Sequence, residues 1–191
     1  RTLALCYGGL DLEGPTRWMR TDDLDYATLA RATLGEEGGD HCVVLAAGPD
    51  RWLAGWQDRG PGALDWAIAT VDDDGRIRGA VRSLSSPPLA ATRRPGGFAW
   101  AALDATDRSV ARVTLADDDG GERDLVVTST DATPIEAMAI AAAPPPASVD
   151  LDVAWIDGRG LATSVLAPDG TLRASARDPE RPAIRGGPAL A

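Results

Sequence analysis

The chain has 191 residues, of which 44% are hydrophobic and 25% are charged, a composition that is ordinary for a globular protein with one or two modest cores. Its basic residues are all arginine, and an excess of acidic residues gives a formal charge of −10, which repels phosphate backbones and anionic lipid surfaces. We therefore expect no nucleic-acid partner, and no apolar stretch approaches the roughly 18–20 residues that a membrane-spanning helix needs.

Four Asp-Gly pairs lie between short runs of Val, Ile, Leu, Thr or Trp. Glycine tolerates positive φ and aspartate bonds to its own backbone, so such pairs favour tight turns between antiparallel strands. They are Asp74-Gly75, Asp119-Gly120, Asp157-Gly158 and Asp169-Gly170. The repeated element of this chain is therefore architectural and contains no reacting group.

The first part of the chain is predicted to hold a strand at 3–7, a loop at 10–20 and one short helix at 21–34. Asp22 and Asp23 are suited to a helix N-terminus and Gly35 to its C-terminal end. Further strands are then expected at 42–47, 52–56, 66–71 and 76–82. In the last of these, Arg76, Arg78 and Arg82 alternate with apolar or small residues, which is typical of a strand with one solvated face.

Residues 85–97, rich in proline, arginine and glycine, are predicted to be a connector between subdomains. Strands are expected beyond it at 111–115, 125–128 and 149–155, whereas 135–143 fits either a short helix or a strand. Residues 178–191 have few large apolar side chains and are predicted to form a mobile tail.

These elements predict a mainly β protein, an antiparallel immunoglobulin-like β-sandwich of hairpins with one short N-terminal helix. Residues 1–92 would form a β-rich subdomain with the helix, 98–177 the immunoglobulin-like sandwich and 178–191 the tail. The intervals between the Asp-Gly pairs are unequal, whereas a propeller or a solenoid has a fixed period, so the pairs are interpreted as hairpins of a sandwich.

Cys6 and Cys42 are the two cysteines, and each lies in a run that is typical of a buried strand. If the two strands are neighbours, a disulfide forms easily, and a single pair in an otherwise cysteine-free chain favours an oxidising compartment. Two buried free thiols are the alternative. Because the sequence begins at Arg1, we expect an export signal or a membrane anchor upstream of it.

The residues offer little for catalysis. His41 is the single histidine, and its neighbour Cys42 points to the opposite face of a strand, so the two cannot easily act as base and nucleophile. No serine lies in a Gly-x-Ser-x-Gly turn, and no glycine-rich phosphate loop occurs. We therefore expect a protein that is not an enzyme, with no catalytic, cofactor-binding or metal-binding residue.

Two acidic runs, Asp72-Asp73-Asp74 and Asp117-Asp118-Asp119, invite the alternative of a calcium site, because Ca²⁺ is bound by carboxylate oxygens. Consecutive aspartates cannot all converge on one ion, however, so solvated hairpin turns are the favoured interpretation. A hydrolase with two facing carboxylates is a further alternative, although no pair among the acidic residues is singled out.

Six tryptophans accompany one phenylalanine and two tyrosines. Trp52 and Trp56 share one strand face by parity and Trp66 is close by, so an exposed platform for sugar rings is one interpretation. Core packing is favoured, because tryptophan is among the few large side chains available to fill a core built otherwise from alanine and valine.

Four stretches stand in an order that resembles a known family: CVVL at 42–45, GGFAW at 96–100, SVARVTLADDDG at 109–120 and VAWIDGRGLA at 153–162. This order is similar to that in extracytoplasmic domains of actinobacterial membrane-anchored proteins, some of them similar to anti-sigma factors. The resemblance implies an exported, non-catalytic sensory or interaction domain with a protein partner, tethered to the membrane only through a segment outside this chain. The alternative is a carbohydrate-binding or lectin-like module that uses exposed tryptophans.

Overall fold

The structure is a computed structural model that describes residues 2–7, 16–22, 28–35, 38–48, 50–58, 65–119, 121–128, 132–142 and 150–178. Within these ranges the regular elements are β-strands. In chain order they are β1 (Thr2–Tyr7), β2 (Thr16–Asp22), β3 (Thr28–Gly35), β4 (Gly38–Ala47), β5 (Arg51–Asp58), β6 (Asp65–Asp72), β7 (Ile77–Leu84), β8 (Pro88–Arg94), β9 (Gly97–Leu103), β10 (Val110–Asp117), β11 (Glu122–Thr128), β12 (Ile135–Ala142), β13 (Leu151–Asp157), β14 (Gly160–Leu166) and β15 (Leu172–Asp178).

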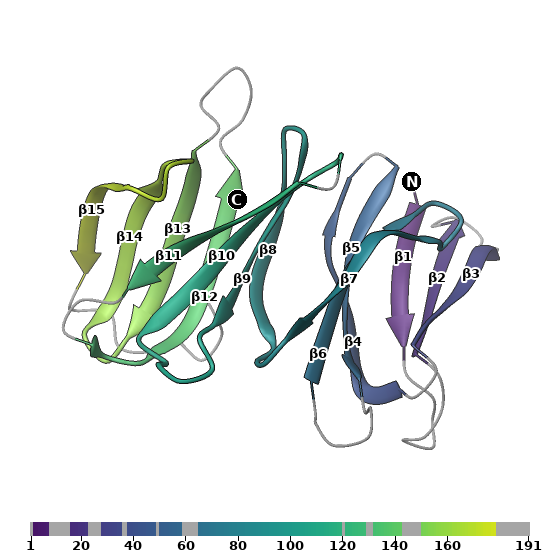
Figure 1. Cartoon of the computed structure of the whole chain (residues 1–191), viewed down its shortest axis with the longest axis horizontal. Helices are drawn as coiled ribbons and strands as arrows, with labels where there is room; N and C mark the ends of the chain where they lie inside the picture. The colour runs from purple at the N-terminus through teal and green to yellow at the C-terminus, as the bar shows by residue number, and fades with distance from the viewer. Residues whose placement is uncertain are drawn as a thin grey trace. The chain divides into compact units, whose positions relative to one another are not determined.

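The strands form consecutive antiparallel sheets, each of which is a simple meander (Figure 1). The described strands make one three-stranded sheet, β1-β2-β3, and three four-stranded sheets, β4 to β7, β8 to β11 and β12 to β15. The mainly β, antiparallel prediction is confirmed. An immunoglobulin-like sandwich exchanges strands between its sheets by Greek-key connections. That strand order is not seen in the described sheets.

The chain divides into two compact units, Arg1–Ser85 and Ser86–Ala191. Each unit contains two successive sheets. In the first unit the first strands of the two sheets, β1 and β4, lie beside each other, and in the second unit β8 lies beside β12 in the same way. The two units therefore repeat one local arrangement.

Each unit has its own hydrophobic core, built mainly from alternate strand residues. In the second unit, Val113 on β10, Leu125 on β11 and Trp155 on β13 belong to one buried cluster that joins both sheets. In the first unit, Trp52, Trp56 and Val71 form the centre of a smaller cluster. The tryptophans thus supply much of the core volume between alanine-rich strands.

The predicted helix at 21–34 is wrong in its described part, where Thr21 and Asp22 end β2 and β3 runs over Thr28–Gly35. Residues 23–27 lie outside the described residues. Asp22 and Gly35, which the sequence suggested as helix ends, are the last residues of β2 and β3. Leu34 is buried and Thr33 exposed, the alternation of a strand, and Thr28 and Thr33 are β-branched residues that favour it.

Two other expectations from the sequence need correction. The loop predicted at 10–20 contains the start of β2 at Thr16, and the connector predicted at 85–97 is mostly strand β8, Pro88–Arg94. The ambiguous segment at 135–143 is strand β12, Ile135–Ala142. The predicted tail beyond Asp178 lies outside the described residues.

The Asp-Gly pairs follow a regular pattern once they are assigned to hairpins. Asp74, Asp119 and Asp169 each lie between the third and fourth strands of successive four-stranded sheets, and they are 45 and 50 residues apart. Asp157 lies in a different hairpin, between the second and third strands of the last sheet. Compared within one kind of hairpin the intervals are similar, so the uneven spacing of all four pairs does not argue against a repeated sheet.

Candidate functional site

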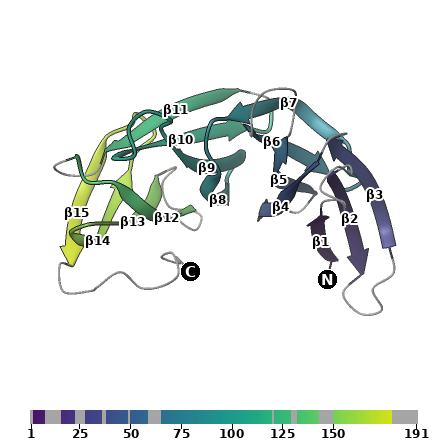
Figure 2. The same ribbon diagram turned by 90° about the horizontal axis from the view of Figure 1, so that it is seen from below.

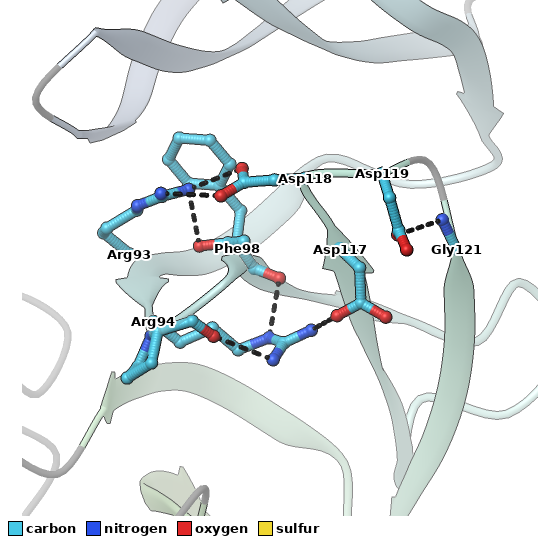
Figure 3. A network of polar contacts seen from close by, with 9 residues as sticks. Arg93, Arg94, Phe98, Asp117, Asp118, Asp119 and Gly121 are labelled. Carbon is cyan, nitrogen blue, oxygen red and sulfur yellow. Dashed lines mark hydrogen bonds and ion pairs between the residues drawn. The ribbon is translucent and has the colours of Figure 1, made fainter. Parts of the chain in front are cut away.

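A network of paired charges lies at one end of the β8–β11 sheet, where two hairpins meet (Figure 3). Arg93 and Arg94 end strand β8, and Asp117, Asp118 and Asp119 lead from β10 into its hairpin turn. The register of β9 against β10 places Gly97 opposite Asp117, so the two hairpin tips come together although they are distant in sequence.

The guanidinium of Arg93 contacts three different groups. Its guanidinium donates two parallel hydrogen bonds of 2.9 Å to the Asp118 carboxylate and one of 3.0 Å to the Gly97 carbonyl. The same group lies 4.8 Å from the centre of the Phe98 ring, a cation–π distance. Figure 3 shows this side chain between the ring and the carboxylate. A bidentate pair of this kind fixes geometry as well as adding stability.

Arg94 joins the same two hairpins by other contacts. It forms an ion pair with Asp117 and donates to the Phe98 carbonyl at 3.4 Å. The backbone N–H of Asp118 donates to the Gly96 carbonyl at 2.7 Å. The carboxylates of Asp117 and Asp118 are therefore engaged by arginine, which is an arrangement for tying hairpins and a poor one for binding calcium.

The second acidic run, at the β6–β7 hairpin, is also bound by groups of its own hairpin. One oxygen of Asp72 accepts the backbone N–H groups of Asp74 and Arg76, and the other forms an ion pair with Arg78 at 2.7 Å. Burial acts to raise the pKa of Asp72, but the hydrogen bonds from Arg76 and Arg78 outweigh it and lower that pKa. The neighbouring Asp73 accepts the Trp52 indole N–H at 3.2 Å.

Asp157 is the most deeply buried carboxylate of the described residues, with a fully covered side chain. Arg177 on β15 donates two hydrogen bonds to it, at 2.6 and 2.9 Å, and the Trp155 indole and the Arg159 backbone donate two more. The Arg177 bonds are the main reason that the pKa of Asp157 is lowered, against the opposing effect of burial. Four donors to one carboxylate make a structural anchor that joins β13, its hairpin turn and β15.

The turn between β9 and β10 has a similar construction on the surface. Asp104 accepts the hydroxyl and the backbone N–H of Thr106 and forms an ion pair with Arg112 at 2.7 Å. These Thr106 bonds, with the Arg112 bond, lower the pKa of Asp104 strongly. Within the described ranges no group of three or more His, Cys, Asp or Glu side chains is placed to hold a metal ion.

The tryptophans singled out by sequence are mostly core residues. Trp52 and Trp56 are 8% and 1% exposed, as the core interpretation predicted, and Trp66 is half-buried. An exposed platform is therefore not formed by Trp52 and Trp56. His41 and Cys42 lie on β4, and the His41 side chain falls outside the described residues. Cys42 is not a free thiol.

The sequence reasoning missed the arginines. Arg93, Arg94 and Arg177 are the residues that engage the aspartates, but an arginine-rich composition hides their importance. Their partners are 20–25 residues away in the sequence. The available signal was the Asp-Gly turn itself, which marks the end of a hairpin where an arginine of a neighbouring strand can reach a carboxylate.

No helix of the described residues is long and apolar enough to cross a bilayer. No protein-family model matches the chain, and no curated protein matches it either. Among solved structures, the chain is similar to the protein in "Crystal structure of BBS1N in complex with ARL6DN, soaked with lead", with a TM-score of 0.55 and 13% identity. The match covers 93% of this chain and 50% of that one, so this chain spans about half the length of its structural neighbour. At this identity the likeness concerns the fold alone.

Proposed function

We propose that the chain is a non-catalytic interaction or sensory domain in the extracytoplasmic part of a secreted or membrane-anchored bacterial protein. The observation that carries this proposal is the use of the acidic residues. At Asp72, Asp104, Asp117, Asp118 and Asp157 the carboxylates are bound by arginines of the same unit. Carboxylates that are paired with arginines in this way stabilise the packing of the strands, and they are poorly placed to act on a substrate.

The sheets are better interpreted as blades than as halves of an immunoglobulin-like sandwich. A four-stranded antiparallel meander that repeats along the chain is the unit of a β-propeller. The consecutive strand order, the adjacent first strands within each unit and the recurring Asp-Gly hairpin all support this interpretation. Propellers commonly serve as rigid interaction platforms, since their blades present many loops and edges on a stable core.

Two further observations support the partner and the compartment. The structural neighbour, BBS1N, is in complex with ARL6DN, so that protein of related fold binds another protein. In the first unit, β1, which contains Cys6, lies beside β4, which contains Cys42, as a Cys6–Cys42 bridge requires. The carbohydrate-binding alternative gains no support from the buried Trp52 and Trp56, so we do not adopt it.

Accessibility in intact cells tests this proposal. The full-length protein would carry an epitope tag at its C-terminus in the bacterium of origin, and intact cells would be treated with trypsin, which cleaves after arginine. We expect the protein to be degraded while a cytoplasmic control protein survives. Protection until the cells are lysed would contradict export, and turnover of a hydrolase substrate that a single aspartate substitution abolishes would contradict a non-catalytic role.

A further inference from the structure

The Asp-Gly pairs of this chain can undergo a spontaneous covalent change. In such a pair the backbone nitrogen of glycine attacks the side-chain Cγ of aspartate, a C–N bond forms, and the N–H proton and the carboxyl hydroxyl leave as water. A second water molecule then opens the succinimide ring, which leaves isoaspartate with one extra methylene in the backbone. Glycine favours the reaction because it has no side chain to hinder the attack. The fold decides which pair reacts.

Two of the pairs, Asp74-Gly75 and Asp169-Gly170, lie in turns with the same backbone hydrogen bond. The glycine N–H donates to the carbonyl three residues earlier, Asp72 in the first turn and Ala167 in the second, at 2.9 Å in each. Both glycines have positive φ, 83° and 89°. Each turn joins neighbouring strands, β6 to β7 and β14 to β15 (Figure 2). The opening that either turn must undergo before its glycine nitrogen can react is therefore similar.

The carboxylates of these two pairs differ. Oδ1 of Asp169 accepts the backbone N–H of Thr171 at 2.9 Å. The corresponding N–H of the β6–β7 turn belongs to Arg76, and it donates at 2.8 Å to Asp72. The Asp74 side chain is exposed, and within the described residues its carboxylate has no hydrogen-bond or ion-pair partner. It can therefore turn toward the glycine nitrogen directly, whereas the Asp169 carboxylate must first lose a hydrogen bond.

The other two pairs are also restrained. Asp157 accepts four hydrogen bonds and its side chain is fully covered. Asp119 is exposed, but its Oδ1 accepts the backbone N–H two residues further on at 3.2 Å. The hydrogen bonds from Arg177 to Asp157 and from Thr171 to Asp169 also lower the pKa of each carboxyl. A lower pKa reduces the protonated form, whose hydroxyl is the group that leaves.

We propose that Asp74-Gly75 is the modification site of this chain, the pair at which the folded protein forms isoaspartate. The proposal is independent of the proposed function, because it concerns the covalent chemistry of one hairpin tip. In the product, the extra methylene lies where Asp72 accepts the N–H groups of residue 74 and of Arg76. The modification should therefore loosen the β6–β7 turn.

Peptide mapping of the aged protein tests the proposal on the whole chain. The folded protein would be incubated at neutral pH below its melting temperature, and the same chain unfolded in guanidinium chloride would be the control. Trypsin cleaves after arginine and places the four pairs in separate peptides, residues 60–76, 113–123, 124–159 and 160–173. We expect isoaspartate to form in the folded chain at least about tenfold faster in the first peptide than in the last, the factor that one hydrogen bond to a charged group supplies. In the unfolded chain the four rates should be similar.

A pair of substitutions transfers the protected turn to the reactive one. Asp72 and Arg76 stand where the β14–β15 turn has alanine and threonine. Asp72→Ala combined with Arg76→Thr therefore frees the N–H of residue 76 to donate to Asp74. We expect the reaction at Asp74 to slow about tenfold, whereas a turn that was merely loosened would react faster. Asp74→Glu is the matched control, because glutamate would have to form a six-membered ring, and it should abolish the reaction at this position.

Faster formation of isoaspartate at any other pair of the folded chain would overturn the proposal. So would similar rates at all four pairs in the folded chain, or a folded chain that forms none after the unfolded control has converted. A double variant whose melting temperature shows that it is folded, and in which Asp74 reacts as fast as in the parent chain, would contradict the protective role of the hydrogen bond and with it the choice of Asp74.

Discussion

At the scale of single residues, the aspartates of this chain stabilise the fold through the hydrogen bonds and ion pairs that their carboxylates accept. A surface ion pair contributes little, but a carboxylate that accepts several N–H groups and a bidentate arginine fixes the strands around it. Asp157 is the clearest case, since β13, its hairpin turn and β15 all supply donors.

We predict that Asp157→Ala destabilises the folded chain by about 3 kcal/mol, because the Arg177 charge and the Trp155 indole lose their acceptor in a buried place. Asp157→Asn retains an acceptor oxygen and should cost less, about 1–2 kcal/mol. Chemical denaturation of the two variants and the parent chain measures both changes in the free energy of unfolding. Equal stability of Asp157→Ala and the parent would contradict an anchoring role.

The same carboxylates predict how stability depends on pH. The folded pKa values of Asp72, Asp104 and Asp157 lie below the ordinary 3.8, so the unfolded chain binds more protons as the pH falls. Their contribution is present above the unfolded pKa and is lost as the pH falls below about 4 through the folded values. Denaturation midpoints should be flat from pH 7 to 5 and fall below that point, more gently in Asp157→Asn. A rise in stability toward acid pH would contradict the lowered pKa values of these aspartates in the folded chain.

At the scale of elements, close backbone contact and paired charges join the hairpins. A Cβ added at Gly97 would lie 1.9 Å from the carbonyl oxygen of Ala116, although the backbone of Gly97 does not require positive φ. The small residue is needed because β9 and β10 approach each other closely next to the Arg93 and Arg94 network.

We predict that Gly97→Ala destabilises the chain by about 1–3 kcal/mol, since the strands must separate to admit a methyl group. Gly158→Ala is the matched control, because a Cβ there meets nothing within 4 Å, and its effect should stay within about 0.5 kcal/mol. Thermal denaturation of both variants makes the comparison. Equal effects of the two substitutions would show that the close approach is unimportant.

The paired charges also predict the response to calcium. Because Arg94 and Arg93 engage Asp117 and Asp118, millimolar calcium chloride should leave the melting temperature unchanged. Magnesium chloride at the same concentration controls for ionic strength. A stabilisation specific to calcium, rising with its concentration as mass action requires, would restore the calcium alternative.

Local patterns predicted the strands well and the larger arrangement poorly. The alternation around Val153 and Trp155 and the Asp-Gly turns identified hairpins, because both signals lie within a few residues. The helix at 21–34 failed because Asp22, Asp23 and Gly35 suit helix ends and hairpin ends alike. The Arg93–Asp118 and Arg177–Asp157 pairs depend on strand register across 25 and 20 residues, which a single sequence does not reveal.

At the scale of the whole molecule, the proposed function requires repeated sheets to form a scaffold that is stable outside the cytoplasm. A bridge between Cys6 and Cys42 would join the first two sheets through β1 and β4. Loop-closure entropy for this separation predicts a stabilisation of up to about 4 kcal/mol.

We predict that a reductant lowers the melting temperature of the parent chain, because the unfolded state regains the freedom that the bridge removes. Cys42→Ser should show the same lower value with or without reductant and provides the control. If the reductant leaves the melting temperature of the parent chain unchanged, the predicted bridge between Cys6 and Cys42 would no longer support export.

The redox state of the cysteines in living cells tests the central claim of an exported scaffold most directly. Intact cells that produce the full-length protein would be treated with a thiol-alkylating reagent before lysis, and the mass of the purified protein would be measured before and after reduction. An exported, bridged chain should show no alkylated cysteine until the protein is reduced, and then two reactive thiols, Cys6 and Cys42. Two cysteines already alkylated in the first sample would contradict the claim.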